Sequence, residues 1–209
     1  MIAKHYKGPF QLHCITDDGA GIKPEVNVIP LWDDLRSMGG CYTRLKLFHE
    51  NMADLIGKDF FSIDLDVLIV GDITDLINQT RKNYDFKIWG DTNPTTPYNG
   101  SFFYMKAGSR RQVWHDFHPV TSPAEGIKRK YVGTDQAWIG ACLGPHEPKW
   151  TTADGVFSFR VHFGPRVTRT PNKRDRLLGD ERIIFFHGSN DPSKPKTWAQ
   201  APWVRQFWK

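Results

Sequence analysis

Two aspartates interrupt an otherwise apolar stretch near the middle of the chain, Phe60-Phe61-Ser62-Ile63-Asp64-Leu65-Asp66-Val67-Leu68-Ile69-Val70-Gly71-Asp72-Ile73. The apolar and β-branched residues on either side of the pair predict two short buried strands, at residues 60–63 and 67–70. Side chains two positions apart on an extended chain point the same way, so the carboxylates of Asp64 and Asp66 can converge on one object. Open α/β sheets place their ligand sites at such strand ends.

The aspartate pair predicts a divalent metal site. Two neighbouring carboxylates repel each other unless a cation neutralises them, and oxygen donors suit Mg²⁺ or Mn²⁺. An Asp-x-Asp pattern is weak by itself, since a chain with 18 aspartates contains about 1.5 such pairs by chance. The competing interpretation, a solvated turn between two strands, leaves two carboxylates inside an apolar stretch without a role, so we favour the metal.

A second apolar run, at residues 183–186, is followed by a polar segment that begins with His187 and Gly188. The run predicts a buried strand that delivers His187 to its end, and the glycine lets the backbone turn closely there. A histidine at a strand end is more often structural than a ligand. Beside two aspartates it completes a mixed nitrogen and oxygen donor set, which favours Mn²⁺, and Lys194 would supply a point charge for a phosphate.

Strand-like and helix-like segments alternate along the remaining chain. We expect strands at residues 10–16, 26–30, 86–89, 101–105 and 158–163, and helices at residues 42–51, 73–79, 109–117 and 134–143. The alternation predicts an α/β sheet with helices packed on its faces, within one domain over residues 1–209. The tryptophans near the end of the chain (Trp198, Trp203 and Trp208) are expected to pack on the sheet.

Composition excludes several classes of protein. The 209 residues are 39% hydrophobic and 13% aromatic, too much for a disordered chain, and no apolar run approaches the ~20 residues of a membrane span. Three scattered cysteines argue against a disulfide framework, and with no secretory leader visible they predict a reducing, cytoplasmic location. The net charge of +5 favours anionic partners. A basic run at residues 166–176 is either a solvated loop or an anion-binding loop.

Four segments resemble those of nucleotide-sugar transferases with the GT-A fold, and family 8, which includes glycogenin and bacterial lipooligosaccharide galactosyltransferases, is the nearest group. Residues 61–73 are similar to its Asp-x-Asp segment, and residues 186–195 to its C-terminal block of His, Gly, Lys and Pro, here with a longer spacer. Residues 98–105 resemble its Asn-containing strand, and residues 133–138 the start of its Asp-Gln helix. The order and approximate spacing match over residues 10–198.

The resemblance implies a GT-A-like mixed, mostly parallel sheet with helices on both faces, shortened at the N-terminus because residues 1–9 cannot supply the family's first strand and helix. It implies a hexosyltransferase, retaining in mechanism, that moves a sugar from a nucleoside-diphosphate donor, most simply a UDP-sugar. The roles it implies are a metal site for Mn²⁺ or Mg²⁺ at Asp64, Asp66 and His187, donor contacts from both aspartates, Asn99, Gly188 and Lys194, and catalytic contacts from Asp135 and Gln136.

The acceptor implied by the resemblance is a saccharide, a lipid-linked molecule or a protein. Peripheral contact with a membrane is compatible with this resemblance, and no nucleic-acid partner is expected. Two alternatives stay open. In the first, the chain is a GT-A-like module that has lost catalysis and serves binding or assembly. In the second, it is a nucleic-acid-binding protein. The last rests only on a pI near 9.1 and on basic and aromatic residues spread through a chain without a nucleic-acid motif.

Overall fold

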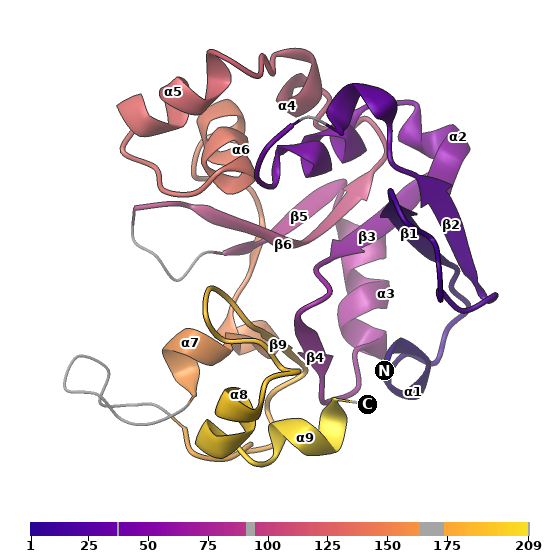
Figure 1. Cartoon of the computed structure of the whole chain (residues 1–209), viewed down its shortest axis with the longest axis vertical. Helices are drawn as coiled ribbons and strands as arrows, with labels where there is room; N and C mark the ends of the chain where they lie inside the picture. Colours follow the sequence, from indigo (N-terminus) through magenta and orange to yellow (C-terminus); the bar gives the residue numbers. More distant parts are fainter. Residues whose placement is uncertain (37, 91–94, 164–173, 209) are drawn as a thin grey trace.

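The computed structural model describes residues 1–36, 38–90, 95–163 and 174–208, and its strands form three sheets (Figure 1). The sheets contain two, four and three strands, in the spatial orders β1-β2, β3-β6-β5-β7 and β4-β9-β8. In chain order the strands are β1 (Leu12–Thr16), β2 (Val26–Pro30), β3 (Asp59–Ile63), β4 (Val67–Ile69), β5 (Phe86–Gly90), β6 (Tyr98–Lys106), β7 (Lys149–Trp150), β8 (Val156–Ser158) and β9 (Ile183–Phe185).

The helices are short, and most lie on the outer faces of the two larger sheets. Figure 1 shows α4 and α6 on the side of the four-stranded sheet, with α5 packed on α6, and α7, α8 and α9 near the three-stranded sheet. They are α1 (Ile2–His5), α2 (Met52–Ile56), α3 (Thr74–Asn83), α4 (Gln112–His115), α5 (Ser122–Lys128), α6 (Asp135–Leu143), α7 (Phe159–His162), α8 (Pro195–Gln200) and α9 (Val204–Phe207), with 3₁₀ helices η1 (Asp33–Leu35), η2 (Tyr42–Phe48) and η3 (Thr152–Asp154).

Alternating side chains of the strands divide the interior into three hydrophobic clusters. Along β6, Phe102 and Tyr104 face a cluster shared by both larger sheets, whereas Phe103 and Met105 face a cluster covered by η2, α4 and α6. Along β4, Leu68 faces a third cluster, formed with α7 and α9. The period of two places every second residue of a strand in a different cluster, which fixes the register of each sheet.

The mixed α/β architecture is confirmed, but the sheet is less parallel than expected. Among the described strands the pairings divide evenly: β1-β2, β5-β7 and β8-β9 are parallel, and β3-β6, β4-β9 and β5-β6 are antiparallel. The difference arises because β6 pairs antiparallel with a strand on each side, and β9 runs antiparallel to β4.

Several predicted elements differ in extent or type. The helix expected at residues 42–51 is instead η2 followed by α2, and the apolar residues Leu45, Phe48 and Met52 at helical spacing are buried. The helix expected at residues 109–117 is reduced to α4, and the one expected at residues 73–79 extends to Asn83. The strand expected at residues 158–163 is wrong: Ser158 ends β8, and its hydroxyl accepts a hydrogen bond from the Val161 amide (3.4 Å), which starts α7.

The C-terminal tryptophans pack as predicted. Trp198, Trp203 and Trp208 lie against the cluster that contains Leu68 and Ile184 of the three-stranded sheet. No helix in the described part of the chain combines the length and the apolar character that a membrane crossing requires.

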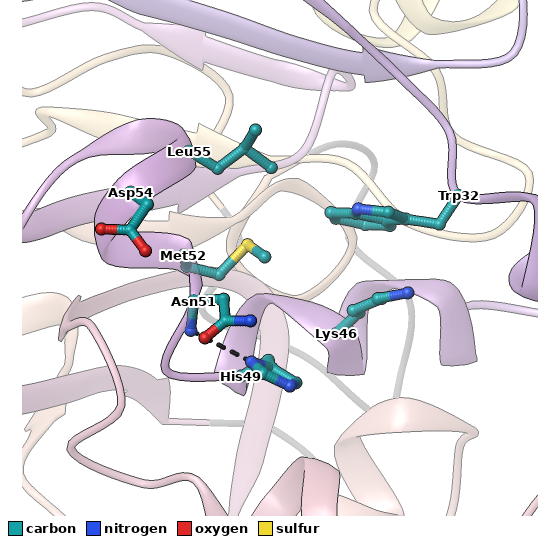
Figure 2. Close-up of a pocket in the computed structure, with 7 residues that line it drawn as sticks. All are labelled: Trp32, Lys46, His49, Asn51, Met52, Asp54 and Leu55. Carbon is teal, nitrogen blue, oxygen red and sulfur yellow. Dashed lines mark hydrogen bonds between the residues drawn. The ribbon is translucent and has the colours of Figure 1, made fainter.

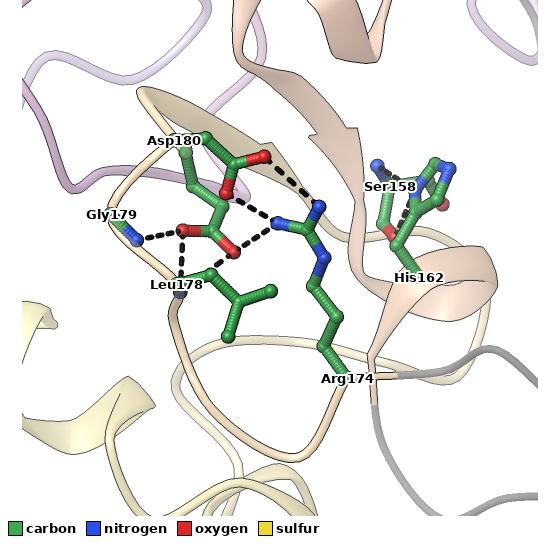
Figure 3. A network of polar contacts seen from close by, with 7 residues as sticks. Ser158, His162, Arg174, Leu178, Gly179 and Asp180 are labelled. Carbon is green, nitrogen blue, oxygen red and sulfur yellow. Dashed lines mark hydrogen bonds and ion pairs between the residues drawn. The ribbon is translucent and has the colours of Figure 1, made fainter.

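A buried carboxylate fastens the segment that leads into β9. The Glu181 side chain is 1% exposed and accepts hydrogen bonds from the amides of Leu178 and Gly179, both at 3.0 Å, and from Arg174 at 2.6 Å. Figure 3 shows Arg174 also paired with Asp180, at 2.6 Å. Most of the basic run predicted at residues 166–176 lies outside the described residues, but Arg174 is engaged in structural ion pairs.

Candidate functional site

The segment from Asp64 to Asp66 is the short connection between the four-stranded and the three-stranded sheet, where β3 passes into β4 (Figure 1). Its backbone is held on both sides. The Asp64 amide donates to the Ser101 carbonyl of β6 at 2.9 Å, and the Phe186 amide donates to the Asp66 carbonyl at 3.1 Å. The two aspartates therefore stand at the junction of the sheets, beside the residue that precedes His187.

Arg44 connects two of the predicted site residues. Its guanidinium forms an ion pair with Asp64 and a second one, at 2.8 Å, with Asp135 at the start of α6. The exposed fractions of the three side chains are 19%, 26% and 6%, so the network is largely withdrawn from water. A planar guanidinium presents five donors in a rigid fork, so it can hold two carboxylates at once in a fixed geometry.

Sequence reasoning missed Arg44. The only signal was weak: Arg44 is one of two cations, with Lys46, in a segment whose apolar residues Leu45 and Phe48 are buried. A charged residue beside buried positions needs a partner, but the sequence does not say which acid supplies it. Burial raises the pKa of Asp135, and the positive charge of Arg44 acts in the opposite direction.

Gly100 of β6 makes room for this network. A Cβ atom at this position would collide with Asp135 Oδ2 and would lie 2.7 Å from Arg44 Nη1. Replacing Gly100 by alanine is expected to lower the free energy of unfolding by about 1–3 kcal/mol, because the buried ion pair has to shift to admit the methyl group.

The measurement for Gly100→Ala is a pair of chemical denaturation curves, with Gly39→Ala as the matched control. A Cβ atom at Gly39 meets nothing within 4 Å, so that variant should unfold like the wild type. Equal midpoints for Gly100→Ala and Gly39→Ala would show that the Arg44–Asp135 pair relaxes freely around the added methyl group.

The surroundings of Asp66 disfavour the ionised form of its carboxylate. Burial, together with the negative charges of Asp64 and Asp191, raises the pKa of Asp66 to about 6. Asp191 was not singled out from the sequence; its carboxylate accepts hydrogen bonds from the amide (2.8 Å) and the hydroxyl (2.6 Å) of Ser193, and these lower its pKa. Two acids thus act on Asp66, and the positive charge of Arg44, which pairs with Asp64, opposes part of the rise in the pKa of Asp66.

His187 follows β9 and lies on the ring of Trp89, with ring centroids 5.2 Å apart and planes inclined by 16°. Burial lowers the pKa of His187 to about 4; the Asp64 carboxylate opposes this shift, and the charge of Arg160 adds to it. The imidazole is therefore neutral near pH 7, which is the form that coordinates metal ions.

The remaining predicted site residues have identifiable contacts. Asn99 accepts a hydrogen bond from the Ser101 amide at 2.9 Å, and Gln136 donates one to the Val132 carbonyl at 3.1 Å. Gly188 has a φ of 63°, a left-handed conformation that favours glycine, and Lys194 is exposed, 4.0 Å from Asp191. The contact with Asp191 places Lys194 near an acid that acts on Asp66, whereas these hydrogen bonds of Asn99 and Gln136 are to residues nearby in the sequence.

The donor types in this region fit a divalent ion, although the donors are not assembled into a cage. Two carboxylates and a neutral imidazole are suitable ligands for Mn²⁺. Burial and the neighbouring acids raise the pKa of Asp66, and a bound cation would favour its ionised form. Across the described ranges, no three histidine, cysteine or acidic side chains lie close enough together to hold a metal ion. Arg44 already provides one positive charge to Asp64.

Comparison with solved structures places the chain in a known fold. The structure matches the galactosyltransferase LgtC, solved in complex with donor and acceptor sugar analogues, with a TM-score of 0.54 and 15% identity over 88% of this chain and 73% of that one. A structure of an active-site glutamine-to-glutamate variant of LgtC matches equally, at 14% identity and 74% coverage of that chain. No protein-family model matches, and neither does any curated protein sequence. The architecture is thus the GT-A-like one.

Proposed function

We propose that the protein is a metal-dependent glycosyltransferase that uses a nucleoside-diphosphate sugar, with a UDP-sugar as the first choice. The observation that supports this most is the group of side chains at the sheet junction, in a chain folded like LgtC. It contains acids whose charge is only partly compensated, a neutral histidine and an exposed lysine. A diphosphate with its metal ion would balance that charge arrangement.

In this proposal, Asp64, Asp66 and His187 hold the divalent ion, which supplies positive charge to the leaving diphosphate when bound. Lys194 and the backbone at Gly188 contact the pyrophosphate oxygens. Lys194 is exposed, with its ammonium free to turn from Asp191 toward a stronger anion. Stabilising the charge that develops on the departing diphosphate is the largest contribution that the protein can make to sugar transfer.

Asp135, Gln136 and Asn99 are proposed to face the sugar and the acceptor. Arg44 holds the Asp135 carboxylate at 2.8 Å, so its orientation is fixed before substrate arrives. Gln136, the next residue of α6, would hydrogen-bond a sugar hydroxyl. We further propose that transfer retains the anomeric configuration, which NMR of the first product formed from an α-linked donor would decide.

The test of the proposed function is calorimetry with UDP, GDP and CDP, each in the presence of Mn²⁺ and again with EDTA. We expect UDP to bind only with the metal, because the acidic site repels a diphosphate until its charge is offset. Binding that is equal with and without Mn²⁺ would contradict metal dependence. Absence of binding by all three nucleotides would contradict the transferase and favour a module that has lost catalysis.

A further inference from the structure

A hollow of about 370 Å³ opens between η2, α2 and the segment after β2, and none of the residues that line it belongs to the candidate site. Its volume falls within the range of about 300–1,000 Å³ typical of small-molecule sites. The lining residues are Trp32, Lys46, His49, Asn51, Met52, Asp54 and Leu55. The hollow is therefore distinct from the candidate site at the junction of the sheets, with which it shares no lining residue.

One side of the hollow is apolar. Figure 2 shows the Trp32 ring across the hollow from Met52 and Leu55 of α2. Met52 is 3% exposed and forms part of the interior, whereas Leu55 is 38% exposed at the rim. The half-buried indole offers a flat apolar surface that water only partly covers, which is a frequent feature of interfaces and ligand sites.

The other side carries polar groups that the protein does not use. Within the described residues, the side chains of Asn51 and Asp54 make neither a hydrogen bond nor an ion pair. His49 accepts a hydrogen bond at Nδ1 from the Asn51 amide, 3.0 Å away, which leaves its Nε2 available as a donor. An amide, a carboxylate and an imidazole thus stand together at the rim with hydrogen-bonding capacity to spare.

The charge of the hollow selects against anions. The single lysine in its lining, Lys46, is 2.9 Å from both carboxylate oxygens of Asp34, so its charge is already offset. The same ammonium stands 5.1 Å from the centroid of the Trp32 ring, which satisfies the ring's preference for a cation. Asp54 remains as an uncompensated negative group, and a phosphate or carboxylate ligand would be repelled.

We propose that this hollow binds a neutral saccharide. The apolar C–H face of a sugar ring would lie against Trp32, and its hydroxyl groups would pair with Asn51, Asp54 and His49. The choice of a saccharide among neutral, hydroxyl-rich ligands rests on the proposed function. The hollow would then hold a part of the acceptor or product distant from the reacting end, and it adds a binding site that the transfer reaction itself does not require.

The test uses the methyl signal of Met52 in protein labelled with ¹³C at the methionine methyl groups, assigned with Met52→Leu. The probes are lactose, maltose and cellobiose, with sorbitol as an open-chain control that has hydroxyl groups but no ring. We expect at least one disaccharide to shift the Met52 signal with millimolar affinity, and Trp32→Ala to weaken that binding about tenfold or more. Trp208→Ala, outside the hollow, should bind like the wild type.

The proposal is overturned if none of the three disaccharides shifts the Met52 signal, or if sorbitol produces the same shift. Undiminished binding in Trp32→Ala would overturn it as well. Failure here is distinguishable from failure of the proposed function, since Trp32→Ala should retain the metal-dependent response to UDP. Conversely, a protein that binds disaccharide at Met52 but never binds UDP would contradict only the transferase.

Discussion

Replacing Arg44 by methionine is expected to lower the free energy of unfolding by about 3–5 kcal/mol, because a buried carboxylate then loses the charge that compensates it. The Asp135 side chain is 6% exposed and cannot recover hydration without opening the start of α6. Methionine keeps the length and apolar stem of arginine, so the loss reports the charge rather than the packing. Chemical denaturation at neutral pH measures the effect.

The same logic predicts a partial rescue. In Arg44→Met/Asp135→Asn the buried negative charge is removed as well, so the double variant should be more stable than Arg44→Met alone. Arg36→Met is the matched control. Arg36 pairs at 2.8 Å with Asp33, whose side chain is 94% exposed, and losing such a surface pair should cost about 1 kcal/mol or less. If Arg44→Met unfolds like Arg36→Met, the buried network does not need the arginine.

The Asp66→Asn variant is expected to lose metal-dependent nucleotide binding. The loss should exceed the ~10–100-fold that removing an outer-shell partner costs, because a proposed ligand itself is removed. The measurement is a set of melting curves with EDTA, with Mn²⁺, and with Mn²⁺ plus UDP. Wild-type protein should melt higher with Mn²⁺ plus UDP than with EDTA, whereas Asp66→Asn should show no such shift. A wild type without the shift would remove the main support for the transferase.

In EDTA the same variant should be more stable than the wild type at neutral pH. The pKa of Asp66 is raised to about 6, so ionisation is harder in the folded protein than in the unfolded chain. Wild-type stability therefore falls as pH rises from about 4 to about 6, and Asp66→Asn should escape this loss, on the order of 2 kcal/mol. Below about pH 4 the difference should vanish, because Asp66 is protonated in both states.

Asp72→Asn provides a control with the opposite sign. Hydrogen bonds from Thr74 and Lys7 hold the pKa of Asp72 below its usual range, so its charge stabilises the folded protein. Its replacement by asparagine should lower stability at neutral pH. If Asp66→Asn in EDTA is destabilised as well, the Asp66 carboxylate is a structural hydrogen-bond acceptor, and the solvated-turn interpretation of the aspartate pair is correct.

Local sequence patterns predicted the positions of the buried strands better than their pairing partners. The apolar runs before Asp64 and around Leu68 are strands as expected. The run around Leu68 is buried throughout and the run before Asp64 is partly buried, and both leave a readable hydrophobic signature in the sequence. Whether a neighbour runs parallel or antiparallel depends on contacts distant in sequence. No local pattern indicates that the connection from Asp64 to Asp66 leads from one sheet into another.

The candidate site likewise contains residues that local sequence patterns predict and residues that they do not. Asp64, Asp66 and His187 were selected because each follows an apolar run, and the structure places that connection and His187 at the ends of buried strands. Arg44 and Asp191 were missed because neither follows such a run: Arg44 lies in a 3₁₀ helix, and Asp191 in a turn closed by Ser193. Their effect on the site is electrostatic and depends on distance in space.

The Arg44 network also imposes an order on biosynthesis. Arg44 lies 20 residues before Asp64 and 91 residues before Asp135, so the second acid emerges 71 residues after the first. At about 5–20 residues per second, the nascent chain waits roughly 4–14 s with the arginine paired to only one of its two acids. The first half of the protein can therefore collapse early, but its buried charges are balanced only when α6 leaves the ribosome and docks. A ribosome that stalls before α6 would expose an incomplete core to chaperones and proteases.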